Sequence, residues 1–240
     1  MLNIISRLHR FLVSQSFYPL LLSTALAMAL FIARVVVSGN RIVYANLVWN
    51  LFLAWIPYLF SMLAAALRRL FPGRWWLLII PAIIWLAFFP NAPYIMTDFF
   101  HLMPRPTIPL WYDILLLVSF SWTGLFLAVA SLRTMQVLVN AYLGNVIGWL
   151  FVALALGLGG MGIYLGRFER WNSWDLISHP HSIVLDIVTR LTDPLENLRF
   201  FIFTLLFSSL LWVCYLMFIS ARNAAAADEW LDRTNPRNRI

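Results

Sequence analysis

A long apolar run near the C-terminal end of the chain reads LRFFIFTLLFSSLLWVCYLMFISA, from Leu198 to Ala221. Arg199 is its one charged residue. A helix rises about 1.5 Å per residue, so a helix of this length crosses the roughly 30 Å hydrocarbon core of a bilayer. This run therefore predicts a transmembrane helix.

Five further runs have the same character. They are Phe17–Val37, Tyr44–Leu67, Trp75–Tyr94, Trp111–Val137 and Tyr142–Leu165. Hydrophobic residues make up 62% of the 240 residues and charged residues 11%, whereas a soluble domain is nearer half apolar and a quarter charged. The sequence predicts an all-α polytopic transmembrane bundle of six spans over residues 17–221. A short segment (1–16) precedes it and a polar tail (222–240), frayed and then disordered, follows it.

The 17 basic residues are all arginines, and most flank the apolar runs. The net charge of +7 therefore indicates membrane topology and a bilayer partner, with no nucleic acid. With the N-terminus inside, ten arginines fall on the inner face. The other seven fall outside: Arg34, Arg41, Arg105, Arg167, Arg170, Arg190 and Arg199. Seven of the ten acidic residues also fall outside, so both termini are predicted to be cytoplasmic.

Several kinds of site and signal are excluded. The single cysteine, Cys214, rules out an intramolecular disulfide and a cysteine-based zinc site. Nucleotide-loop, metalloprotease, dithiol and serine-hydrolase motifs are absent from the sequence. The first run is long enough to span and lacks a small-residue cleavage site, so we expect a retained helix. In the fifth run, the spacing Gly162-x-x-x-Gly166 indicates close helix packing.

A proline-rich stretch, FPNAPYIMTDFFHL (residues 89–102), opens a predicted outer segment, 90–110. Its prolines prevent one continuous helix, and the break is expected inside the outer leaflet. Broken backbone at that depth must be buried in protein or line a wet cavity. Thr97 is predicted to cap a new short helix, which would place Asp98 and His101 on one face.

Polar residues at this break are candidates for a functional site. The ligand-binding candidates here are Asn91, Tyr94, Thr97, Asp98 and His101. Each has a structural alternative: Asn91 could satisfy freed backbone groups, and Asp98 could only complement a helix N-terminus. Together, an amide, a carboxylate and an imidazole at one membrane edge favour function.

A second predicted outer segment, 166–197, begins with GRFERWNSWD. Its ligand-binding candidates are Arg167, Arg170, Trp171, Asn172, Ser173, Trp174 and Asp175. The alternative is an interfacial belt of tryptophans and arginines. Further on, apolar residues share one face of a predicted helix, 183–191, with an Asp186–Arg190 pair on the other, which suits a helix lying flat on the membrane.

Three of the four histidines fall outside in this topology. His101, His179 and His181, together with Asp98, are candidate ligands of a divalent metal such as zinc; the alternative is ordinary surface histidines. Catalytic candidates are Asp98, His101 and Asp175. We expect Asn46 and Asn50 to form hydrogen bonds between helices, and Arg34 to extend to the outer headgroups.

The motifs Pro90-Asn91-Ala92-Pro93-Tyr94 with Thr97-Asp98 and His101-Leu102, and Gly166-Arg167-Phe168 with residues 170–175, resemble a family of bacterial multi-spanning membrane proteins. That family is known only as a domain of unknown function. The resemblance covers roughly Tyr44 to Ala221. It implies a bacterial inner-membrane location and two motif-bearing outer segments, but no reaction or ligand.

Three classes of function remain open. An enzyme acting on an envelope or lipid-linked substrate at the outer face predicts a pocket closed below, with Asp98 as general base or metal ligand. A small-solute transporter or channel predicts a cavity leading from Asn91 and Asp98 toward Asn46 and Asn50. A structural or assembly protein, which could be a homo-oligomer, predicts a dry, fully hydrogen-bonded motif. In every case we expect the two motif segments to meet.

Overall fold

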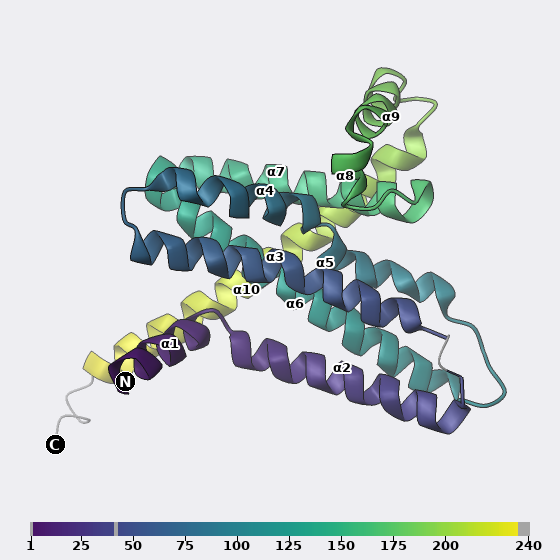
Figure 1. Ribbon diagram of the computed structural model, residues 1–240, viewed down its shortest axis with the longest axis horizontal. Coiled ribbons are helices and arrows are strands. Elements are labelled where there is room, and N and C mark those ends of the chain that lie inside the picture. Colours follow the sequence, from purple (N-terminus) through teal and green to yellow (C-terminus); the bar gives the residue numbers. More distant parts are fainter. Residues whose placement is uncertain (1, 41–42, 235–240) are drawn as a thin grey trace.

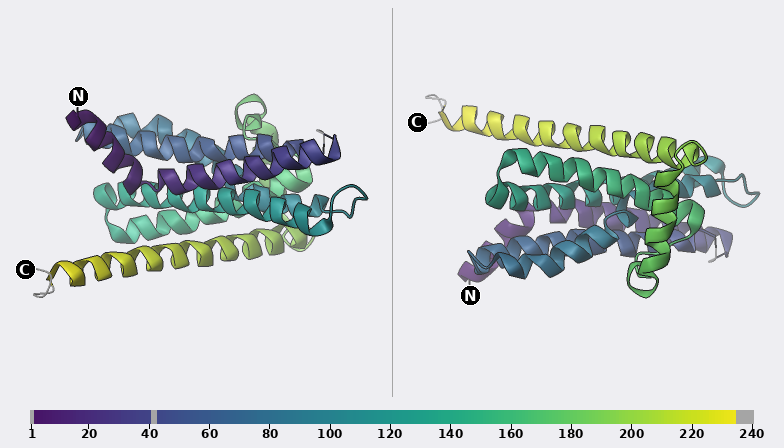
Figure 2. Two further views of the ribbon diagram at one scale, coloured as in Figure 1. Left: turned by 90° about the horizontal axis from the view of Figure 1, so that it is seen from below. Right: turned by 90° about the horizontal axis from the view of Figure 1, so that it is seen from above.

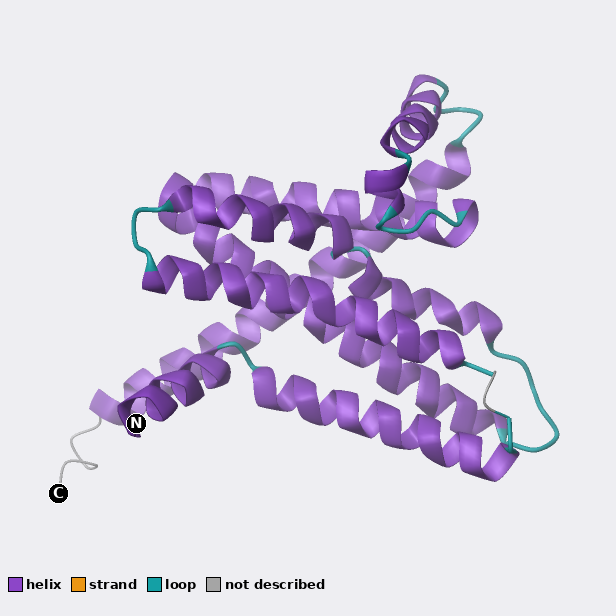
Figure 3. Cartoon of the chain, viewed as in Figure 1, coloured by secondary structure: helices purple, strands orange, loops and turns teal. Residues whose placement is uncertain are grey.

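The structure is a computed structural model that describes residues 2–40 and 43–234. Arg41, one of the predicted outer arginines, and the end of the tail, 235–240, lie outside these residues. Within them the chain is helical, without a strand, and only an isolated bridge joins Arg105 to Ile108. Figure 3 shows this helical content, with loops confined to the connections. The predicted all-α class is confirmed.

Six segments are long and apolar enough to cross a membrane, as predicted. Four are the single helices α2 (Phe17–Ser38), α3 (Ala45–Leu70), α6 (Leu110–Leu143) and α10 (Leu198–Thr234). The other two are composite. The third span joins η1 (Trp75–Leu78), α4 (Ile79–Phe88), α5 (Asn91–Tyr94) and η2 (Ile95–His101), and the fifth joins α7 (Asn145–Tyr164) to η3 (Leu165–Glu169).

The long helices run in roughly one direction, and both chain ends lie at the same end of the bundle (Figure 1). We call this the terminal end; it also holds the turn at 71–74. The opposite end, here the motif end, holds η2, the loop 102–109 and the short helices α8 (Asp175–Ser178) and α9 (Pro180–Thr192). Two termini at one end agree with an even number of spans.

Helix α6 forms the centre of the bundle. It packs against α2, α3, α5 and α7, and Leu116, Phe120 and Leu127 on it are fully buried. By contrast, α10 lies along the outside in both views of Figure 2 and packs mainly against α7. Its side chains remain largely exposed, Leu205 at 68% for example, because lipid rather than water is the solvent that suits this surface.

Helix α9 crosses the direction of the long helices (Figure 2). It is longer than the predicted helix 183–191 and begins at Pro180. Ile183 is buried while Val184 and Val188 are exposed, and the predicted Asp186–Arg190 ion pair is present at 3.0 Å. This orientation and this exposed apolar surface agree with a helix lying along the membrane surface.

The expectation that Arg34 extends to the headgroups is wrong. Its side chain is 1% exposed and makes a two-pronged contact with Asp113 of α6, with Nε–Oδ1 at 2.7 Å and Nη2–Oδ2 at 3.1 Å. Asp113 is equally buried. The Asp113 carboxylate compensates the charge through Nε and Nη2, whereas Arg34 Nη1 is buried without a hydrogen-bond partner among the described residues.

Candidate functional site

The first motif segment bends at Pro90 but remains helical. After α4 ends at Phe88, the chain passes through a turn into α5 and then directly into the 3₁₀ helix η2. Thr97 therefore lies inside a continuing helix and donates a hydrogen bond to the Tyr94 carbonyl. The prediction that Thr97 caps a new helix is wrong, because η2 continues α5 without an interruption to cap.

Three glycines allow neighbouring helices to approach this segment closely. A Cβ on Gly124 of α6 would collide with the Ala92 carbonyl, and one on Gly162 of α7 would lie 2.6 Å from Pro90. At Gly166 it would lie 3.3 Å from the Tyr94 ring. The close packing predicted for Gly162-x-x-x-Gly166 is thus packing against the first motif.

Asp98 is the buried carboxylate of the first motif segment. Its side chain is 1% exposed, and its two oxygens accept hydrogen bonds from Asn46 at 3.3 Å and Asn50 at 2.8 Å. His101 Nδ1 lies 3.7 Å from the carboxylate, and Arg167 Nη1 lies 3.5 Å from it. The carboxylate is therefore fixed by three elements: α3, η2 and η3.

His101 is the exposed member of this group, with 52% of its side chain accessible. Arg167 Nη2 lies 3.2 Å from His101 Nδ1. Since arginine can only donate, Nδ1 is the acceptor in this contact, and the neutral ring carries its proton on Nε2. The group thus offers a proton donor next to a compensated carboxylate–guanidinium pair.

A hydrogen bond joins the two motif segments. Asn91 Nδ2 donates to Ser173 Oγ at 2.7 Å, across 82 residues of sequence, and also to the Phe88 carbonyl at 3.1 Å. The ring of Trp174 lies edge-on to Trp49 of α3, with centroids 6.4 Å apart. The two segments meet, as the sequence predicted.

Asp175 has a local role in this arrangement. It accepts a 2.7 Å hydrogen bond from the Asn172 backbone N–H, which holds the pKa of its carboxyl below the usual value. Its other contacts are with Ser178 and, at 3.8 Å, His179. Asp175 thus fixes the turn that leads into α8, and no contact joins it to Asp98 in the described residues.

The remaining residues of the second segment attach α9 to the bundle. Trp171 Nε1 donates to Asp186 at 3.3 Å, and Arg190 pairs with Glu169 at 2.9 Å. Arg170 adopts a left-handed backbone conformation with φ 62° and is exposed. These contacts hold α9 beside the two motifs.

A cavity of about 100 Å³ lies between the motif segments and α3. Its walls include Asn50, Asn91, Tyr94, Trp171 and Asn172. A cavity of this size has room for a few waters or one small polar group. Most of its wall surface is polar, which suits hydrogen bonding rather than an acyl chain.

The predicted metal ligands do not assemble. His179 contacts Asp175 and Ser178 instead of His101, and His181 is exposed. Among the side chains that the structure describes, no group of three or more His, Cys, Asp or Glu residues could hold a metal ion. Metal binding by this site remains a prediction without a ligand set.

Asn46 and Asn50 form the predicted hydrogen bonds between helices, but the identity of their acceptor, Asp98, was not predicted. Two amides four residues apart in an apolar span were a usable signal, since they share one helix face. What the sequence did not reveal is that this face is opposite Asp98. Arg34 and Asp113, 79 residues apart, were missed as a pair for the same reason.

Residues 49–214 match the family described as "Protein of unknown function (DUF1361)", and the chain belongs to this family. The match includes both motif segments and the five spans from α3 onward to Cys214. No curated protein and no solved structure matches the chain. The predicted membership of a family of unknown function is confirmed.

Proposed function

We propose that this membrane protein binds the polar part of an envelope or lipid-linked molecule in the cavity between its two motif segments. The observation that carries the proposal is the Asn91–Ser173 hydrogen bond, which joins both motifs around one polar cavity that Asn50 also lines. We place this cavity at the extracytoplasmic face of a bacterial inner membrane, following the arginine distribution and the family resemblance.

The position of α9 supports a ligand that comes from the membrane surface. Trp171 and Arg190 attach this helix beside the cavity, while Leu185 and Leu191 expose more than half of their surface. An amphipathic helix at the headgroup level would bring the cavity to the depth of lipid headgroups. A soluble ligand would need no such apolar surface next to its site.

Processing of the bound molecule would use Asp98, His101 and Arg167. The exposed imidazole of His101 has a ring nitrogen that can exchange a proton with a bound molecule, and the buried Asp98 and the partly buried Arg167 keep it in place through the contacts described above. Arg170, which is exposed, would attract an anionic group of the ligand. Asp175, by contrast, is proposed to position the second motif.

Transport of a small solute is less well supported. A transport route would have to continue from the cavity toward the terminal end, yet Trp85 and Phe89, on the adjoining turns of the third span, are each 1% exposed. Phe89 also packs against Gly159. We infer from this packing that the cavity does not continue toward the terminal end, which favours binding or processing over passage.

Native mass spectrometry of the purified protein tests the proposal. We expect a retained ligand on wild type, and its loss from Asn91→Ala and Ser173→Ala, since each removes one side of the bond between the motifs. Ser178→Ala is the matched control, because Ser178 is exposed and bonds only within its own turn. Metal content is measured on the same samples. Equal retention by all four monodisperse proteins, or no retained mass on any, would refute the proposal.

A further inference from the structure

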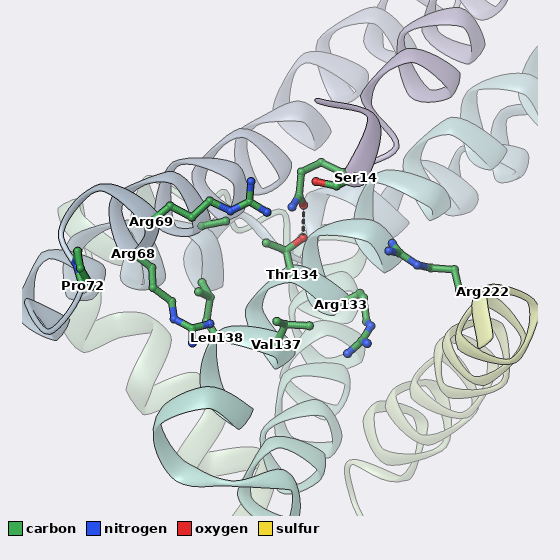
Figure 4. Close-up of a pocket in the computed structure, with 11 residues that line it drawn as sticks. Ser14, Arg68, Arg69, Pro72, Arg133, Thr134, Val137, Leu138 and Arg222 are labelled. Carbon is green, nitrogen blue, oxygen red and sulfur yellow. Dashed lines mark hydrogen bonds between the residues drawn. The ribbon is translucent and has the colours of Figure 1, made fainter. Parts of the chain in front are cut away.

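A second cavity, of about 560 Å³, lies at the terminal end of the bundle, far from the motifs. Four arginines line it: Arg68 and Arg69 from α3, Arg133 from α6 and Arg222 from α10. Figure 4 shows them around Thr134, which donates a hydrogen bond to Gln15 at 2.7 Å. We call it the arginine cavity.

The arginines of this cavity have neutral partners. Arg68 lies over Tyr142, Arg69 over Phe11 and Arg222 over Phe218, at 4.7–6.0 Å from the ring centroids. Arg133 donates to Gln136 at 3.4 Å. Among the described side chains, no carboxylate lies within ion-pair distance of any of the four guanidinium groups.

Four guanidinium groups around one cavity favour an anionic ligand. Arginine's planar array of donors matches phosphate oxygens, often through two hydrogen bonds at once. Rings stacked on the guanidinium faces leave the in-plane N–H groups available. Phosphate is therefore the chemistry that this cavity fits, and the source is either a lipid headgroup or a soluble phosphate compound.

The surroundings of the cavity favour the lipid. Two apolar hollows of about 370 and 240 Å³ both include Phe126 of α6 and Phe218 of α10, and residues 16–23 also line the smaller one. We call them the α6–α10 groove. Arg133 lies one helical turn after Val129 of this groove, and Arg222 lies one turn after Phe218. These two arginines therefore lie at one end of the α6–α10 groove. A soluble phosphate compound would make no contact with this apolar groove.

We propose that the terminal end binds an anionic phospholipid, with its phosphate in the arginine cavity and an acyl chain in the α6–α10 groove. The arginines then contact the phosphate of the lipid, and the apolar groove contacts its acyl chain. This site is independent of the proposed motif cavity, which lies at the opposite end and has walls of amides and aromatic rings.

The single cysteine provides a probe without any substitution, because Cys214 lines the α6–α10 groove. The rate of its modification by a small maleimide is measured in detergent with added phosphatidylglycerol, phosphatidylcholine or inorganic phosphate. We expect phosphatidylglycerol to slow labelling of wild type by about tenfold or more, and the other two to have little effect.

Two variants connect this protection to the arginines. The double variant Arg133→Gln/Arg222→Gln should abolish the protection. Arg222→Gln alone should reduce it, and because Arg222 is exposed, this single change should leave the fold intact. Arg74→Gln, which removes an exposed arginine at the same end, is the control and should behave as wild type. Equal protection by both lipids, protection by phosphate alone, or protection that survives in Arg133→Gln/Arg222→Gln would overturn the proposal.

Discussion

The two ends of the bundle treat their arginines differently. At the motif end, Arg34, Arg167 and Arg190 each lie within ion-pair distance of a carboxylate that the chain itself supplies. At the terminal end, Arg68 and Arg133 face a cavity with neutral partners only. Paired charges fix helices relative to one another, whereas unpaired ones in a cavity remain available for an external anion.

This contrast separates two tasks within one fold. At the motif end, ion pairs hold α9, η2 and η3 around a small polar cavity. The terminal end keeps four cations in a larger space, where their mutual repulsion opposes close packing unless an anion joins them. Substitutions should therefore affect stability mostly at the motif end and ligand binding mostly at the terminal end.

The largest expected effect on stability comes from Arg34→Met. It leaves Asp113 buried with Arg105, at 3.9 Å, as its remaining cationic neighbour among the described side chains, and breaking such a pair costs about 3–5 kcal/mol. Arg74→Met, which removes an exposed arginine at the terminal end, should change stability by about 0.5 kcal/mol or less. Free energies of unfolding in mixed micelles measure both. Similar losses for the two variants would break the contrast between the ends.

A middle-sized effect is expected at the motif site itself. Asp98→Ala deprives Asn46 and Asn50 of their acceptor and should cost about 1–3 kcal/mol. His101→Ala removes a side chain that is half exposed and should cost about 1 kcal/mol or less. The same unfolding titrations compare them. If His101→Ala proves the more destabilising, the imidazole is structural and its proposed role in proton transfer fails.

The fold was largely predictable because the bilayer sets the length of each span. Six apolar runs predicted six spans, and the cluster of prolines that begins at Pro90 marked the bend there. The structure differs where a helix can exceed the membrane: α6 continues to Leu143, six residues past the predicted Val137, and α10 reaches Thr234 through part of the predicted tail. Apolarity gives no signal for helix that extends into water.

The sequence predicted which residues form the site, but not all of the contacts between them. Asn91, Asp98 and Ser173 were named from the two motifs, and the structure brings Asn91 and Ser173 into contact. The partners of Asp98 on α3 were not predicted, because which faces of two helices meet depends on the packing of the whole bundle. Similarly, His179 lies beside Asp175 and not beside His101, because Asp175 is only four residues away in the sequence.

The smallest effect is expected from the pH dependence of Asp175. Its pKa is lowered from the usual value of 3.8, first by the Asn172 backbone N–H, so the unfolded chain takes up its proton at a higher pH than the folded one. The stabilisation is therefore complete above about pH 4 and is lost as pH falls through the lower folded pKa. Thermal midpoints measured from pH 6 to pH 3 should decline more for wild type than for Asp175→Asn, which lacks the titrating group. Parallel curves would mean that the turn at 172–175 is held by its packing against Trp49 and not by this carboxylate, and the motif end would then depend on charge less than the contrast between the two ends requires.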